Sequence, residues 1–199
     1  MKSAVITVTS TGQGIIEALS MTERFGAERN LDAKPVLHLR LLAEELFGML
    51  RSIAGNVEAS YWLDADGKKF ELHMRSDVEM SLEMRDKFLA ASSSGRNEAA
   101  KGFMGKIRDM IGEMLLSAQD TVPYPMPDTT FLYPMDDPFG DYIWSMNYYV
   151  EELQRKMENN KEASEAWDEL EKSIVASIAD DIKVKIKGKK VEIILYKSF

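Results

Sequence analysis

The sequence lacks cysteine altogether and contains only two histidines, His38 and His73. Without thiols the chain can form no disulfide, no catalytic thiolate and no cysteine-ligated zinc site. Two histidines are too few for a histidine-rich metal centre. We expect a structural or surface role for both, with His38 near the start of a helix and His73 within a strand. The composition therefore predicts no metal-ligating residues of these types.

The sequence also lacks an excess of positive charge and any long apolar run. Its 25 Lys and Arg residues against 33 Asp and Glu residues give a formal net charge of −8, which argues against a general affinity for nucleic acid or anionic lipid. No apolar stretch approaches the roughly 20 residues that a membrane-spanning helix needs. The N-terminal segment MKSAVITVTSTG is too short and too polar for a signal peptide. We therefore expect a cytoplasmic protein that binds neither nucleic acid nor membrane.

Proline is scarce except in one segment, and this uneven distribution indicates how the chain is organised. Five of the six prolines lie in DTVPYPMPDTTFLYPMDDPFGDY, residues 120–142. We expect this segment to be a long irregular connection rather than a helix or a regular strand. The 199 residues are 45% apolar and 29% charged, which is typical of one globular domain or of one domain with a large insertion.

Hydrophobic periodicity predicts short strands alternating with helices. A strand is expected at 4–11, and two hairpins at 57–75 and 182–199, where Asp66-Gly67 and Gly188 indicate tight turns. Helical spacing is expected at 15–29, 33–54, 77–91, 98–116, 145–158 and 163–181. This order predicts an α+β fold, a two-layer α/β sandwich with helices on one face of a mixed β-sheet. Residues 1–116 and 180–199 would form the sandwich, and 117–179 an insertion with helices.

The helix that contains LRLLAEELFGMLRSIAG, residues 39–55, carries two adjacent glutamates, Glu44 and Glu45, beside an apolar stripe. This helix and the order of the elements resemble the GHKL (Bergerat-fold) superfamily of histidine-kinase-like ATPases, and most closely the small anti-sigma-factor serine kinases. The resemblance extends over residues 3–116 and 180–199. In that family a glutamate on this helix is followed four residues later by an asparagine. Laying AEELFGMLRSIA on the pattern puts Glu45 at the glutamate and Met49 at the asparagine.

The resemblance implies ATP as the ligand and Glu45 as the base of a serine-kinase or ATPase reaction. The family's asparagine is a ligand of Mg²⁺, which prefers hard oxygen donors, and the soft thioether of Met49 is a poor replacement. We therefore expect no Mg²⁺ at this helix, and weak phosphoryl transfer or none. The helical pattern alone supports another interpretation, in which Glu44 and Glu45 simply flank the apolar stripe and are partly solvated.

Two further segments fall where that family binds its nucleotide. Asp77, in RSDVEMS, aligns with the family's aspartate that accepts a hydrogen bond from the exocyclic amine of adenine. A cap for a helix that starts at Ser81 is an equally good interpretation of Asp77. The serine- and glycine-rich stretch that leads into the helix at 98–116 would contact phosphates, because helix N-termini and lysines favour anions. Serine-rich loops before helices are also common caps. The candidate residues of this stretch are Ser93, Ser94, Gly95, Asn97, Lys101, Gly102, Gly105 and Lys106.

Two functions are compatible with these observations. The first is a nucleotide-binding protein with weak or no phosphoryl transfer. The second is a catalytically degenerate regulatory module that uses the sandwich and the 117–179 insertion to bind a protein partner without nucleotide. A homodimer is compatible with either. The aromatic residues of 122–144 would then cover the nucleotide side, form a partner interface, or pack on their own domain.

Overall fold

A single antiparallel sheet organises the protein, whose computed structural model describes residues 1–52, 56–79, 103–119, 133–134, 142–157 and 160–199. Its seven strands lie in the order β1-β2-β3-β7-β6-β5-β4. The strands are β1 (Ile6–Thr9), β2 (Glu58–Asp66), β3 (Lys69–Asp77), β4 (Tyr133–Pro134), β5 (Tyr142–Ser145), β6 (Asp181–Lys187) and β7 (Lys190–Ser198). The helices are α1 (Ile15–Ala27), α2 (Ala33–Ser52), α4 (Phe103–Gln119), α5 (Met146–Lys156), α6 (Lys161–Glu171) and α7 (Ile174–Ile178). The predicted α+β sandwich is thus confirmed.

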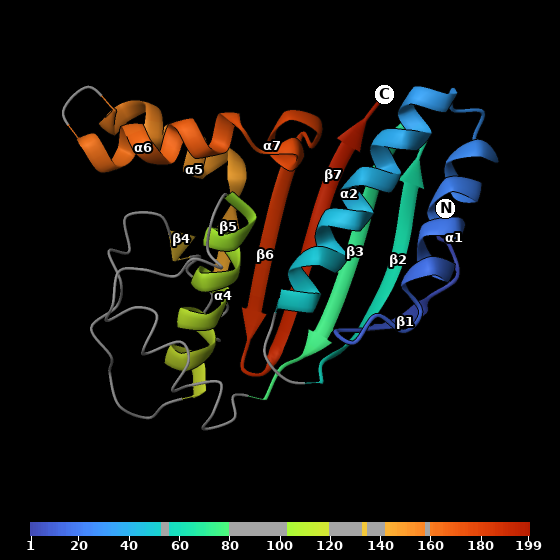
Figure 1. Ribbon diagram of the computed structural model, residues 1–199, viewed down its shortest axis with the longest axis horizontal. Helices are drawn as coiled ribbons and strands as arrows, with labels where there is room; N and C mark the ends of the chain where they lie inside the picture. The colour runs from blue at the N-terminus through green and yellow to red at the C-terminus, as the bar shows by residue number, and fades with distance from the viewer. Residues whose placement is uncertain (53–55, 80–102, 120–132, 135–141, 158–159) are drawn as a thin grey trace.

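Helices α1, α2 and α4 lie on one side of this sheet (Figure 1). The predicted apolar stripe of α2 is confirmed, because Leu39, Leu42 and Leu46 are fully buried. The strands bury alternate residues against these helices, as their two-residue period requires. In β2, Tyr61 and Leu63 are fully buried while their neighbours on the other face are less so. The apolar core therefore lies between the helices and one face of the sheet.

Two hairpins supply the centre of the sheet, and both were predicted. Strands β2 and β3 meet at a turn in which Asp66 pairs with Lys69, and Gly67 has a φ of +58°. Strands β6 and β7 meet in the same way at Gly188, which also has a φ of +58°. Glycine adopts this left-handed backbone without the Cβ penalty of other residues. The long-range pairing of β3 with β7 then joins the two hairpins.

The structure differs from the sequence prediction in three places. We expected a mixed sheet, but every pair of strands in the described residues is antiparallel. The proline-rich segment was expected to be irregular throughout, yet β4 lies within it and pairs with β5, which begins at the last residue of the segment, Tyr142. The single helix expected at 163–181 is divided into α6 and α7, because the Ser173 hydroxyl accepts a hydrogen bond from the Ala176 N–H at 3.3 Å and caps a new helix. None of the helices in the described ranges is long and apolar enough to cross a membrane.

Candidate functional site

The acidic pair of α2 separates into two carboxylates with different surroundings. Glu44 accepts a hydrogen bond at 2.9 Å from Arg40, one turn earlier on the same helix. Arg40 also pairs with Glu23 of α1 at 2.7 Å. The hydrogen bond and the charge of Glu23, followed by those of Glu44, raise the pKa of Arg40. Glu44 therefore helps to join α1 to α2 at the surface, which matches the interpretation of a partly solvated residue beside the stripe.

Glu45 is half-buried and forms no ion pair with the described residues. Burial raises the pKa of its carboxyl group above the ordinary value, and the neighbouring charge of Glu44 adds to this effect. A desolvated carboxyl group of this kind is suited to accept a proton, as a general base must. The role of Glu45 as a base stays a prediction.

Met49 lies one helical turn beyond Glu45, where the resemblance to GHKL ATPases would put their metal-binding asparagine. Its side chain is only 3% exposed and belongs to the main hydrophobic core. A thioether is a poor ligand for Mg²⁺ in any setting, and here it is part of the hydrophobic core. At this turn of α2 the side chain of residue 49 therefore contributes to packing.

Asp77, the candidate for adenine recognition, lies at the end of β3 with an exposed side chain. It lines an open polar hollow of about 500 Å³ together with strand residues that include Thr7, Ser60 and Arg75. The lining of this hollow includes no residue of α2 or α4. Asp77 therefore lines this hollow and Glu45 does not, whereas a shared nucleotide site would require both residues to line it.

The predicted phosphate-binding stretch lies mostly outside the described residues, which do not include Ser93, Ser94, Gly95, Asn97, Lys101 and Gly102. Their roles stay predictions. The remaining two, Gly105 and Lys106, lie in the first turn of α4. The Lys106 ammonium is 2.9 Å from a carboxylate oxygen of Glu169 on α6. This lysine therefore pairs with a carboxylate of its own chain.

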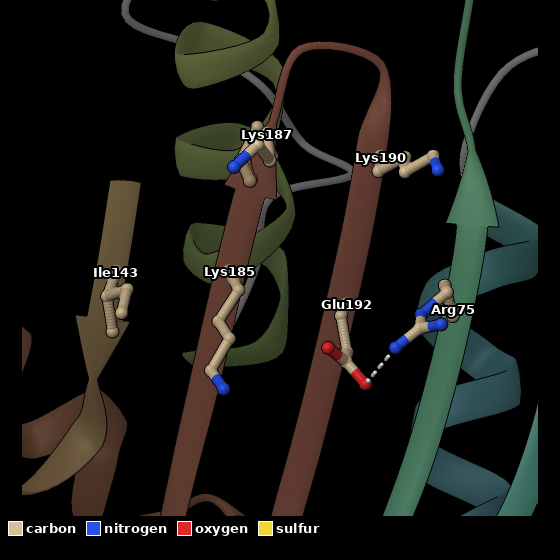
Figure 2. A pocket seen from close by; sticks show the side chains of 7 residues that line it. Arg75, Ile143, Lys185, Lys187, Lys190 and Glu192 are labelled. Carbon is tan, nitrogen blue, oxygen red and sulfur yellow. Dashed lines mark hydrogen bonds and ion pairs between the residues drawn. The ribbon is translucent and has the colours of Figure 1, made fainter. Parts of the chain in front are cut away.

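A second hollow, which the sequence analysis missed, lies on the sheet face opposite α2 and α4; we call this face the open face (Figure 2). It has a volume of about 300 Å³, and β3, β5, β6 and β7 all contribute to its lining. Four cationic side chains surround it: Arg75, Lys185, Lys187 and Lys190. The carboxylate of Glu192 also lies there and accepts a hydrogen bond from Arg75 at 3.1 Å. The alternation in IKVKIKGKK was the available signal, because it places every second residue on one face.

Farther along the open face, His73 is surrounded by carboxylates. Its Nε2 atom is 3.1 Å from Glu71 and 3.7 Å from Asp64, and its Nδ1 atom is 3.6 Å from Glu192. The imidazole stacks on Trp62 with a centroid separation of 4.8 Å and an interplanar angle of 6°. Both rings are less than a tenth exposed. His73 thus lies in a strand, as predicted, and packs in an aromatic and polar cluster.

Comparisons with protein-family models, with curated proteins and with solved structures found no match to this chain. The likeness to GHKL ATPases therefore stays a prediction from the sequence, and function has to be inferred from the geometry of the described residues.

Proposed function

We propose that this protein is a regulatory binding module, an ATPase-like sandwich that binds a protein partner and does not catalyse Mg²⁺-dependent phosphoryl transfer. The burial of Met49 supports this proposal most directly. Phosphoryl transfer depends on Mg²⁺ to neutralise charge that develops on the phosphates. The residue that would hold the ion is a core thioether with 3% of its surface exposed.

The surroundings of two other candidate residues support the same proposal. Lys106 is paired with Glu169, so a phosphate would have to compete with a carboxylate of the same chain for this lysine. Asp77 lies on the lining of a hollow to which α2 does not contribute. Glu45 keeps a raised pKa, but a general base accelerates transfer only when metal, phosphate and acceptor are positioned with it.

An ATP-turnover assay tests this proposal. The purified chain is incubated with ATP and Mg²⁺, and ADP release is compared with that of the Glu45→Ala variant, prepared in parallel. We expect the two proteins to show the same background rate, with or without a chelator. Mg²⁺-dependent ADP release that Glu45→Ala abolishes would overturn the proposal, because it would establish a catalytic base together with a metal.

A second candidate function is nucleotide binding without transfer, and the hollow beside Asp77 favours it. The volume of this hollow, about 500 Å³, falls within the range of small-molecule sites. The exposed carboxylate of Asp77 can accept a hydrogen bond from the exocyclic amine of adenine. A ligand that binds only the folded state raises the melting temperature. A rise with adenosine or ADP that Asp77→Asn removes would establish this function, and the absence of any rise at millimolar nucleotide would exclude it.

A further inference from the structure

The side of α2 that faces away from the sheet, which we call its outward side, is apolar at its centre. The buried residues of this helix, such as Leu39 and Leu46, face the sheet. With 3.6 residues per turn, the opposite side carries Leu37, Leu41 and Gly48. The side chain of Leu37 is 52% exposed, Leu41 is half-buried and Gly48 is exposed. Because the outer side of a surface helix is normally charged or polar, the outward side of α2 has the character of a contact surface.

Gly48 is a second reason to expect a contact on this side. A Cβ atom at this position would meet no atom within 4 Å, so packing against the described residues does not require a glycine here. A glycine in the interior of a helix destabilises it relative to alanine. Figure 1 shows α2 in front of the sheet, with no other described helix drawn across it. The glycine therefore leaves room for another molecule to approach the helix closely.

Two residues of opposite charge flank the leucines of the outward side. Lys34 is exposed and lies one turn before Leu37, and Glu45 is half-buried and lies one turn after Leu41. Neither Lys34 nor Glu45 forms an ion pair with a described residue, whereas Glu44 does. Eleven residues of helix span about 16 Å and three turns plus about 20°. The two charges therefore lie on the same edge of the outward side, too far apart to pair with each other.

These four side chains form a pattern that is complementary to itself in the antiparallel direction. The midpoint between Leu37 and Leu41 is position 39, and that between Lys34 and Glu45 is position 39.5. The two midpoints differ by less than about 1 Å along the helix axis. A second α2 that runs in the opposite direction therefore brings its Leu41 to Leu37 and its Glu45 to Lys34. A two-fold axis repeats both contacts, so charge and spacing both match a second copy of the same helix.

We propose that the outward side of α2 binds a second copy of this chain, so that two α2 helices pack antiparallel about a two-fold axis. Such an interface is isologous, because the same surface serves both copies. A contact of one helix from each copy buries less than the roughly 1,200 Å² of stable interfaces, so we expect a dissociation constant on the order of 10–100 μM. The inference goes beyond the proposed function, since it concerns self-association and not phosphoryl transfer.

Charge reversal tests this proposal by sedimentation equilibrium on the full chain, at concentrations from about 5 to 500 μM that bracket the expected dissociation constant. Lys34→Glu and Glu45→Lys each turn two attractions of the symmetric dimer into repulsions, and each should weaken dimerisation about tenfold or more. The double variant restores opposite charges across the interface and should dimerise within about threefold of the wild type. Lys68→Glu, at an exposed position in the β2–β3 turn, controls for net charge and should change dimerisation by less than about twofold.

A mixture of the two single variants tests the pairing between chains directly. A heterodimer of Lys34→Glu with Glu45→Lys has opposite charges at both contacts, so the mixture should associate about as tightly as the wild type, although neither variant does so alone. Leu37→Ala tests the apolar contact and should weaken dimerisation several-fold. Its matched control is Ile174→Ala in α7, which truncates a side chain that is 51% exposed, against 52% for Leu37, and should leave dimerisation unchanged. Circular dichroism and thermal melting check that every variant folds.

Four results would overturn the proposal. The first is a wild-type chain that stays monomeric at the highest concentration. The second is a pair of charge reversals that weaken dimerisation no more than Lys68→Glu does, which would place the interface elsewhere. The third is a double variant and a mixture that associate no better than the single variants, and the fourth is equal weakening by Leu37→Ala and Ile174→Ala. None of these results bears on phosphoryl transfer, and Mg²⁺-dependent ADP release would overturn the proposed function even if the chain dimerises through α2.

Discussion

Replacing Met49 by asparagine tests whether α2 can hold a metal. The side chain is 3% exposed, so its loss forfeits nearly the full transfer free energy of a buried methionine, about 1.5–3 kcal/mol. The new amide would be buried in the hydrophobic core, and an amide that gains no hydrogen-bond partner there costs about a further 1–3 kcal/mol. We therefore expect Met49→Asn to lower the free energy of unfolding by about 2.5–6 kcal/mol. Urea denaturation followed by circular dichroism measures this, and Met49→Leu, expected to cost less than about 1.5 kcal/mol, is the matched control.

The same variant tests the functional argument. If position 49 lined a nucleotide site, its new amide would hold Mg²⁺, and Mg²⁺-ATP at about a hundred times its dissociation constant would restore roughly 2.7 kcal/mol of stability. Because Met49 belongs to the core, we expect Mg²⁺-ATP to leave the unfolding curve of Met49→Asn unchanged. A stabilisation that needs both Mg²⁺ and ATP, and that the wild type lacks, would refute this reasoning. So would a Met49→Asn protein as stable as Met49→Leu.

Three further predictions, which use five substitutions, test the local structure by urea denaturation. The pKa of Glu45 is raised above 4.5 in the folded protein, so its contribution to the free energy of unfolding is complete below pH 4.5 and is lost as the pH rises through the folded pKa. Glu45→Gln should remove this pH-dependent loss of stability. The same dependence of stability on pH in Glu45→Gln and the wild type would contradict the prediction. The Tyr61 and Thr22 hydroxyls are 2.8 Å apart and buried. Tyr61→Phe should therefore lower the free energy of unfolding by about 1 kcal/mol, and Thr22→Val, which leaves the buried phenol without this partner, by about 1–3 kcal/mol. A larger loss for Tyr61→Phe than for Thr22→Val would contradict this prediction. Gly14→Ala should cost clearly more than Gly67→Ala, about 1–2 kcal/mol for the latter: both have positive φ, but only at Gly14 would a Cβ overlap a carbonyl oxygen of β1, and equal costs would argue against that contact.

The parts of the fold that the sequence predicted are those set by near neighbours. Alternation and an Asp66-Gly67 pair define the β2–β3 hairpin within one short stretch, and the stripe from Leu39 to Met49 defines the buried side of α2. In both cases the periodicity states which face is apolar, and the core confirms it. Burial and element type could therefore be predicted without knowing how distant segments pair.

The remaining features depend on partners that are distant in the sequence. No local pattern in the sequence indicates that β5 pairs with β6. The relative direction of two strands depends on the path of the chain between them, so the prediction of a mixed sheet was wrong. Likewise, the sequence predicted that Lys106 could contact a phosphate, whereas in the structure it pairs with Glu169 of α6. Ile174 keeps helical spacing with α6, yet it is 51% exposed, because the helix is interrupted before it. The chemistry of a site is sensitive to such contacts, and a pattern of residue types does not encode them.

The helical side of the sheet gives the candidate residues structural roles, and this argues against catalysis there. Lys106 pairs with Glu169, and Met49 belongs to the core. Glu45 has a raised pKa, but a base accelerates phosphoryl transfer only when metal, phosphate and acceptor are positioned with it. We therefore expect no phosphoryl transfer from α2.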